Sequence, residues 1–263
     1  MSFEDDVVLF FKEKYKVDLQ TQGNITIDNM NFPNYMIKRI LNIKNSQYTA
    51  FEYCRIINKI FGINYLTTKK SLYENDEVNI TKKDIVFDLG ANTGIFSLYA
   101  SYRGAKVIAF EPSTLIRHYL YNTKSYNANK FNIAEYAISN KVGSTYLQQT
   151  DNPGASRLMN FNVPEYHKII CLEKCNIITL DKFYQKYGVI PSFIKMDIEN
   201  SELEALLGAK DILKLFHPKV AISIHEENIR KIKEIKSCFP EGYKFYLNEA
   251  ENYDIVLLGR YYG

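Results

Sequence analysis

The sequence predicts an α/β fold in which helices cover both faces of a mostly parallel sheet. From residue 81 onward, short apolar runs alternate with segments of helical spacing. The first apolar run ends in a glycine-containing turn directly before a helix, as in open α/β sheets that bind ligands. The last two apolar runs have no helix between them, which indicates an antiparallel pair. We therefore expect a seven-stranded sheet with an antiparallel edge strand.

The elements follow from this alternation in chain order. Apolar runs of strand length predict five strands, at 85–89, 106–110, 131–136, 193–197 and 220–224. Helical spacing predicts the connecting helices, at 95–103, 113–127, 201–217 and 227–238. The closing pair of strands is expected at 243–247 and 255–258.

One segment departs from the alternation. Residues 144–176 are polar and contain Pro153-Gly154 and Pro164, so the pattern predicts a long loop. Long loops within compact domains commonly have a binding role. We expect this one to be a substrate loop of the domain at 81–263.

The first 80 residues show no catalytic motif and differ in character from the rest. Ser2 to Asp5 has the form of a capping box before an apolar helix face. Residues 23–28 predict a short strand, and 48–61 have amphipathic helical spacing. We expect residues 1–80 to be a mainly helical extension that covers the acceptor site or forms a homodimer surface.

Composition excludes several classes of partner. The formal net charge of +3 comes without a Lys/Arg block, so nothing indicates binding to nucleic acid or an anionic membrane. The acidic start and the short apolar run at 7–11 do not fit a signal peptide or a membrane span. No Cys-x-x-Cys pair is present, which favours reduced thiols over a metal site. These features predict a cytoplasmic protein without membrane insertion.

The turn after the first strand carries the main chemical signal. Asp88 ends the strand, and Gly90 and Gly94 let backbone N–H groups approach a ligand closely. A dinucleotide site would have glycine where Asn92 and Ile95 stand. An acid before the turn suits a cofactor with an ammonium group and would repel a pyrophosphate. The turn therefore predicts S-adenosylmethionine rather than a nicotinamide dinucleotide.

A second acid supports this cofactor. Glu111 lies 111 − 88 = 23 residues beyond Asp88, at the end of the second strand. A carboxylate there can accept hydrogen bonds from both ribose hydroxyls. Both acids in one βαβ unit predict a nucleoside site.

Methyl transfer itself needs an aligned acceptor, exclusion of water and, for a hydroxyl acceptor, a base or a metal. Candidates near the ends of the fourth and fifth strands are Asp197, Lys195, Glu199 and His225. His225 could act as a general base or have a structural role. Lys195 could supply a catalytic ammonium, or its aliphatic stem could simply pack along the sheet. Asp197 and Glu199 suit Mg²⁺ binding or simple interaction with a helix dipole. We assign catalytic roles to Asp197, His225 and Lys195 and no metal ligand, with Mg²⁺ as an alternative.

With these motifs in order, the chain resembles the FkbM family of class I S-adenosylmethionine-dependent methyltransferases over roughly residues 83–226. Four segments carry the resemblance: Val86–Gly94 with Ser97-Leu98, Phe110-Glu111-Pro112, Glu135–Ser139, and Ile194–Glu199 followed by Glu202. The last matches a Lys-x-Asp-x-Glu-Gly-x-Glu signature, except that Asn200 replaces glycine. Asn tolerates a left-handed backbone better than most residues, so the turn is expected to survive.

The resemblance implies a Rossmann-like domain and a cofactor site. The loop around Gly90 would surround the methionine part, Glu111 the ribose, and Ala137 and Ile138 the adenine, with Asp197 beside the transferred methyl. The implied cofactor-binding residues are Asp88, Gly90, Ala91, Asn92, Gly94, Glu111, Pro112, Ala137, Ile138 and Asp197.

The resemblance also implies a substrate class. We expect O-methylation of a sugar hydroxyl on a nucleotide- or lipid-linked glycan precursor, in capsule or other surface polysaccharide biosynthesis. Two alternatives come from other classes. One is a nicotinamide-dependent oxidoreductase on the same fold, against which Asn92 argues; the other is an inactive scaffold that keeps the cofactor pocket.

Overall fold

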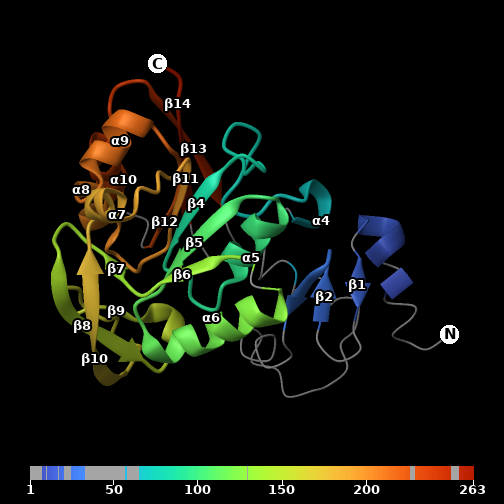
Figure 1. The fold of residues 1–263 in the computed structure, drawn as a ribbon, viewed down its shortest axis with the longest axis horizontal. Coiled ribbons are helices and arrows are strands. Elements are labelled where there is room, and N and C mark those ends of the chain that lie inside the picture. The colour runs from blue at the N-terminus through green and yellow to red at the C-terminus, as the bar shows by residue number, and fades with distance from the viewer. Residues whose placement is uncertain are drawn as a thin grey trace.

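The computed structural model describes residues 8–9, 11–16, 18–20, 25–32, 57, 65–128, 130–225, 229–249 and 255–263. A seven-stranded sheet with the order β13-β14-β12-β11-β4-β5-β6 forms its centre (Figure 1). Its strands are β4 (Ile85–Leu89), β5 (Lys106–Phe110), β6 (Asn132–Ala134), β11 (Phe193–Met196), β12 (Lys219–Ile224), β13 (Tyr243–Glu249) and β14 (Ile255–Tyr261). The expected Rossmann-like α/β architecture is confirmed.

One strand runs against the others. β14 pairs antiparallel with both β12 and β13, whereas the pairs from β12 across to β6 are parallel. The sequence places the antiparallel strand at the edge, and the structure places it one position further in. The reason is that β13 pairs on the outer side of β14 and so becomes the edge.

Successive strand residues point to opposite faces of the sheet, and both faces are apolar, so helices cover both. In β4, Val86 joins one apolar cluster with Leu98 and Tyr99, while Phe87 and Leu89 join another. The helices are α5 (Ile95–Tyr102), α6 (Thr114–Tyr126), α7 (Leu180–Tyr187), α8 (Glu202–Leu207), α9 (Lys210–Phe216) and α10 (Ile229–Ser237). The sheet is thus buried on both faces, as parallel sheets are.

The single helix expected over 201–217 is divided into α8 and α9 at Gly208. A Cβ atom at Gly208 would lie 2.3 Å from the backbone oxygen of Ser139. The chain therefore approaches its neighbour there more closely than any side chain allows.

A second sheet replaces most of the loop expected over 144–176. Its order is β7-β10-β8-β9, and it lies below the main sheet in Figure 1. The strands are β7 (Ala137–Ile138), β8 (Gly143–Thr150), β9 (Arg157–Leu158) and β10 (Ile169–Ile178), with a short helix, η2 (Pro153–Ala155), after β8. Much of β10 is exposed, and Glu173, Lys174 and Asn176 interrupt its apolar pattern, so the strand is not evident in the sequence.

The described part of the N-terminal extension contains a small antiparallel sheet. It consists of β1 (Leu19–Gln20), β2 (Ile25–Ile27) and β3 (Met30–Phe32), accompanied by η1 (Phe11–Tyr15) and α4 (Tyr65–Thr68). β2 matches the strand expected at 23–28. The helices expected near the N-terminus and over 48–61 lie largely outside the described residues.

The extension packs against the main domain through α6. The Asn127 side chain accepts a hydrogen bond from the Asn31 N–H at 2.9 Å and donates one to the Asn31 carbonyl at 2.9 Å. Among the described residues, no helix has the length and apolarity needed to cross a bilayer.

Candidate active site

A pocket lies where the strand order reverses. β5 pairs with one side of β4 and β11 with the other, which creates a crevice at the carboxyl ends of these strands. The pocket encloses about 620 Å³, part of it open to solvent. Its walls come from the β4 turn, the end of β5, the second sheet and the connection after β11: residues 90, 92, 110–113, 116, 136–138, 147, 154, 156–158, 197–199 and 201.

The turn after β4 forms the floor of the pocket. Gly90 has φ +73°, and a Cβ atom there would lie 2.0 Å from the backbone oxygen of Asp197. Asn92 has φ +50°, a left-handed conformation that Asn adopts more readily than most residues. Gly94 has φ +89° and is the N-cap of α5. The spacing of these three residues thus reflects a tight turn pressed against the end of β11.

Glu111 is fixed beside this turn. Its Oε2 accepts a hydrogen bond from the Asn92 N–H at 2.9 Å, and its Oε1 accepts one from the Ser113 N–H at 3.0 Å. Burial raises the pKa of Glu111 to about 7, against the opposing effect of these two N–H donors. Each carboxylate oxygen keeps a free acceptor position, which suits a pair of vicinal hydroxyls.

An apolar wall continues from Glu111. Pro112, Ala137 and Ile138 line the pocket together with Leu147 and Leu158 of the second sheet. Such a surface suits the flat face of a nucleobase. Of the residues expected around the cofactor, Gly90, Asn92, Glu111, Pro112, Ala137, Ile138 and Asp197 line the pocket.

Asp88 and Lys195 lie behind the pocket wall. Asp88 is fully buried; its Oδ2 accepts a hydrogen bond from the Ser97 hydroxyl at 2.6 Å, and its Oδ1 lies 3.2 Å from Lys195 Nζ. Lys195 Nζ donates to the Gly90 carbonyl at 3.0 Å. Burial alone would lower the pKa of Lys195, but the carboxylates of Asp88 and Asp197 raise it above its usual value. The two residues therefore do not line the pocket themselves but stabilise the Gly90 turn, which does.

Asp197 lines the pocket at the end of β11. Its Oδ1 lies 3.0 Å from Nε2 of His225, and its Oδ2 accepts a hydrogen bond from the Tyr73 hydroxyl at 3.0 Å. Burial alone would raise the pKa of Asp197, but the charges of Lys195 and His225 hold it well below its usual range. Asp197 is therefore a carboxylate at any pH at which the protein is expected to work.

His225 follows β12 and carries the complementary charge. Burial alone would lower its pKa, but the hydrogen bond and charge of Asp197 raise it to about 9. The imidazole is consequently protonated at neutral pH. It can accept a proton only after losing this one.

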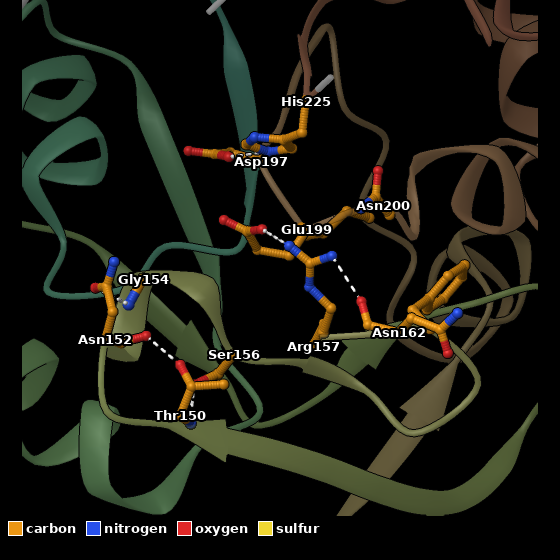
Figure 2. Close-up of polar contacts among 12 residues, drawn as sticks. Thr150, Asn152, Gly154, Ser156, Arg157, Asn162, Asp197, Glu199, Asn200 and His225 are labelled. Atoms are coloured by element: carbon orange, nitrogen blue, oxygen red, sulfur yellow. Dashed lines mark hydrogen bonds and ion pairs between the residues drawn. The ribbon is translucent and has the colours of Figure 1, made fainter. Parts of the chain in front are cut away.

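Glu199 completes the polar side of the pocket. It lies in the left-handed region with φ +51°, as does Asn200 with φ +77°, which fits the expected tolerance of Asn at this turn. The Glu199 Oε2 pairs with Arg157 Nη2 of β9 at 2.8 Å (Figure 2). Asp197, Glu199 and His225 each offer one ligand atom within 4.8 Å of the others.

Whether this trio suits a divalent cation depends on its charges. One imidazole and two carboxylates are acceptable donors for Mg²⁺ or a transition metal. Both carboxylates, however, already pair with cations: Arg157 with Glu199, and Lys195 Nζ 3.8 Å from Asp197 Oδ2. A metal ion would have to compete with these charges.

Two residues of this site, Tyr73 and Arg157, are not among those that the sequence indicates. Tyr73 precedes the first strand of the main sheet, in the part of the chain without a motif; its ring lies beneath Lys195 Nζ at 5.4 Å. Arg157 belongs to the segment expected as a loop. The only signal for Arg157 was the prediction that this segment binds substrate.

The chain is similar to known methyltransferases in sequence and in fold. The methyltransferase FkbM domain profile matches residues 88–249, more than half of the chain. The structure of methyltransferase FkbM from Methylobacillus flagellatus KT aligns with a TM-score of 0.51 at 18% identity, covering 84% of this chain and 57% of that one. Fibrillarin from Aeropyrum pernix, solved with S-adenosyl-L-methionine, aligns with a TM-score of 0.46 at 10% identity, covering 72% and 71% of the two chains.

A curated relative is also similar over part of its length. AMB antimetabolite synthetase AmbE of Pseudomonas aeruginosa is 25% identical over a region that covers 59% of this chain. That region is 9% of the relative's own length, so the chain corresponds to a small part of it.

Proposed function

The chain belongs to the methyltransferase FkbM domain family, and from this premise we propose that its pocket binds S-adenosylmethionine and transfers the methyl group to an oxygen of a small polar acceptor. The observation that carries the proposal is the position of Glu111. Its buried carboxylate faces the pocket at the end of β5, held by the N–H groups of Asn92 and Ser113.

The residues present fit this cofactor. Glu111 can accept hydrogen bonds from both ribose hydroxyls, and the apolar surface at Ala137 and Ile138 suits the adenine ring. Gly90 leaves room where any side chain would collide with Asp197. When bound, the sulfonium of the cofactor supplies an activated methyl group. Asp88 supports the binding turn through Lys195 and Gly90 rather than by direct contact with the cofactor's ammonium group.

The protein's part in the chemistry is alignment and proton removal. In O-methylation a bond forms between the acceptor oxygen and the methyl carbon while the bond from sulfur to that carbon breaks, and the hydroxyl proton must leave. His225 accepts this proton, and the Asp197 carboxylate 3.0 Å away orients its imidazole. The His225 imidazole must be neutral to act as this base. The positive charge of the sulfonium, when the cofactor is bound, would lower the His225 pKa and so favour the neutral form.

The proposed acceptor is a sugar hydroxyl of a nucleotide- or lipid-linked glycan precursor in surface polysaccharide biosynthesis. Adjacent carboxylates at Asp197 and Glu199 suit an acceptor with several hydroxyls, since each can accept hydrogen bonds that water would otherwise provide. Mg²⁺ at Asp197, Glu199 and His225 is an alternative way to lower the hydroxyl pKa. A cytoplasmic location and a homodimer formed through the N-terminal extension belong to the same proposal.

Calorimetric titration of the full chain with S-adenosylhomocysteine, and in parallel with NAD, tests the cofactor assignment. We expect binding of S-adenosylhomocysteine alone, weakened at least tenfold by Glu111→Gln. The matched control is Glu135→Gln, because Glu135 lies at the surface and pairs with Arg117 outside the pocket.

The other outcomes separate the alternative functions. Binding of NAD alone would identify an oxidoreductase and contradict the proposal. Tight binding of S-adenosylhomocysteine without methyl transfer to any of a panel of nucleotide sugars and other small hydroxyl compounds would favour the inactive scaffold.

A further inference from the structure

We propose that Arg157 recognises the acceptor by binding an anionic oxygen, as found on a carboxylate or a phosphate, next to the site of methyl transfer. The inference rests on the proposed function, because it places the acceptor beside Asp197 and His225. It adds a substrate class to that function: the acceptor is acidic.

The first support is the incomplete hydrogen bonding of a buried guanidinium. The Arg157 side chain is only 6% exposed. Nη1 donates to the Asn162 carbonyl at 2.9 Å and Nη2 to Glu199 at 2.8 Å, but the buried Nε has no hydrogen-bond partner among the residues that the structure describes. An arginine that served only to hold the fold would be expected to have its buried donors satisfied. A shift of the side chain toward the pocket on binding would bring this donor to a ligand oxygen.

The second support is the position of the side chain. Arg157 comes from β9 and lines the same pocket as Asp197 and Glu199. Figure 2 shows its guanidinium reaching from the second sheet toward Glu199, with Asp197 and His225 beyond. An acceptor bound between these groups would place a hydroxyl near Asp197 and another substituent on Arg157.

The wall around Arg157 is held in one conformation. The Gly154 N–H donates to Asn152 Oδ1 at 3.2 Å, and the Ser156 hydroxyl donates to Gln149 Oε1 at 3.2 Å (Figure 2 shows the first of these contacts). The Thr150 N–H donates in turn to the Ser156 hydroxyl at 3.2 Å. A preorganised wall lowers the entropic cost of binding, which suits a recognition surface.

The third support is charge. Among the described residues that line the pocket, Arg157 is the only cation, and its charged neighbours there are the acids Glu111, Asp197 and Glu199. Of the described lining residues, only Arg157 would attract an anionic group directly, and the protonated His225 adds a second positive charge next to Asp197. The planar guanidinium also matches the geometry of two oxygens on one carboxylate or phosphate, which an ammonium does not.

The test measures binding to the full chain saturated with S-adenosylhomocysteine. Three probes separate the sources of the anionic oxygen: glucuronate carries a carboxylate, glucose 1-phosphate a phosphate, and glucose neither. Ligand-observed NMR or calorimetry gives the affinities. We expect at least one acidic probe to bind about tenfold more tightly than glucose.

Variants then assign the effect to Arg157. Arg157→Gln is expected to weaken the preferred acidic probe about tenfold and to change glucose binding less than twofold. Arg157→Lys keeps the charge but loses the planar fork. Its affinity for the acidic probe should lie between those of the unmodified protein and Arg157→Gln. The matched control is Arg230→Gln, because Arg230 lies on the exposed surface of α10 with its side chain 87% accessible.

A second variant keeps the test decisive if Arg157→Gln does not fold. Glu199→Gln keeps the guanidinium and removes its counter-ion, so the affinity for the acidic probe should rise severalfold. The gain should be smaller when Arg157→Lys is combined with Glu199→Gln, because the ammonium lacks the planar fork, and an equal gain would contradict the inference.

The inference is wrong if neither acid binds more tightly than glucose, or if Arg157→Gln weakens all three probes equally. If the unmodified protein did not bind S-adenosylhomocysteine, the proposed function would instead be overturned. The two failures are therefore distinguishable.

Discussion

Nε2 of His225 lies 3.0 Å from Oδ1 of Asp197, and the pair joins the ends of two neighbouring parallel strands. β11 ends just before Asp197 and β12 just before His225. The contact therefore depends on strand pairing across 28 residues of sequence, not on a local motif. Because Asp197 also lines the pocket, the pair couples a protonatable imidazole to the proposed reaction centre.

The His225 imidazole should titrate far above its ordinary pKa of 6.5. The Asp197 carboxylate stabilises the imidazolium, so NMR titration should give a pKa of about 9 in the unmodified protein and a clearly lower value in Asp197→Asn. Loss of the signal in His225→Gln assigns it. A value near 6.5 in the unmodified protein would show that the pair does not form in solution.

The same shift has consequences for stability and activity. Because the folded-state pKa is raised, the pair stabilises the fold fully below about pH 6.5 and loses this effect as the pH rises through about 9. If His225 is the base, the pH profile of kcat/KM should rise over the same interval, since only the neutral imidazole accepts a proton.

Cofactor affinity should depend on pH through Glu111. Burial raises its pKa to about 7, so the carboxyl is largely protonated at pH 6 and ionised at pH 8. Ribose hydroxyls bind the ionised form better, because it offers acceptors on both oxygens. We expect the affinity for S-adenosylhomocysteine to rise severalfold from pH 6 to pH 8. Calorimetry in buffers of different ionisation enthalpy should show proton release on binding near pH 6.5, and Glu111→Gln should abolish both effects.

Tyr73 should act as a positioning residue for Asp197. Its hydroxyl donates to Asp197 at 3.0 Å and lies 3.3 Å from the Ser223 hydroxyl. Tyr73→Phe keeps the ring under Lys195 but removes one donor from a half-buried carboxylate, at a cost of about 1 kcal/mol in the free energy of unfolding. Denaturant unfolding measures this cost, and NMR should show a changed His225 pKa.

The control for Tyr73→Phe is Tyr166→Phe, because Tyr166 is 80% exposed. It should change neither the unfolding free energy nor the His225 pKa. Equal effects of the two variants would contradict the positioning role.

The sequence indicates the residues of the β4 turn and of the end of β5 better than the residues on the opposite side of the pocket. Asp88, Gly90, Asn92 and Glu111 lie within one βαβ unit, where strand period and glycine spacing place them before any tertiary contact is known. The residues that the sequence did not indicate meet over long separations: Tyr73 contacts Asp197 across 124 residues. No local pattern encodes such a contact.

The second sheet was missed for a different reason. In β10 the buried residues, Cys175, Ile177 and Ile178, cluster at one end, while the apolar residues at 169–172 are exposed at the other. Glu173, Lys174 and Asn176 interrupt the apolar pattern between these ends, and Pro and Gly residues come shortly before, so the segment resembles a loop in sequence. Arg157 was overlooked with it, although the segment had been predicted to bind substrate.

Gly90 provides a test of the turn that is independent of any acceptor. Gly90 and Gly188 have nearly the same positive φ, +73° and +68°, but a Cβ at Gly90 would lie 2.0 Å from the Asp197 backbone oxygen, whereas nothing lies within 4 Å of one at Gly188. Gly188→Ala therefore measures backbone strain alone, about 1 kcal/mol. Gly90→Ala adds a collision with the end of β11 and should cost roughly 1–3 kcal/mol more.

Binding should separate the two variants more sharply than stability does. Gly90→Ala is expected to abolish S-adenosylhomocysteine binding, because the backbone must move where the turn faces the pocket, while Gly188→Ala should bind it like the unmodified protein. Denaturant unfolding and calorimetry on both variants give the comparison. The two variants could instead lose the same free energy of unfolding and both bind S-adenosylhomocysteine. In that case the contact between the turn and Asp197 does not shape the proposed cofactor site, and the floor of the pocket must be formed in another way.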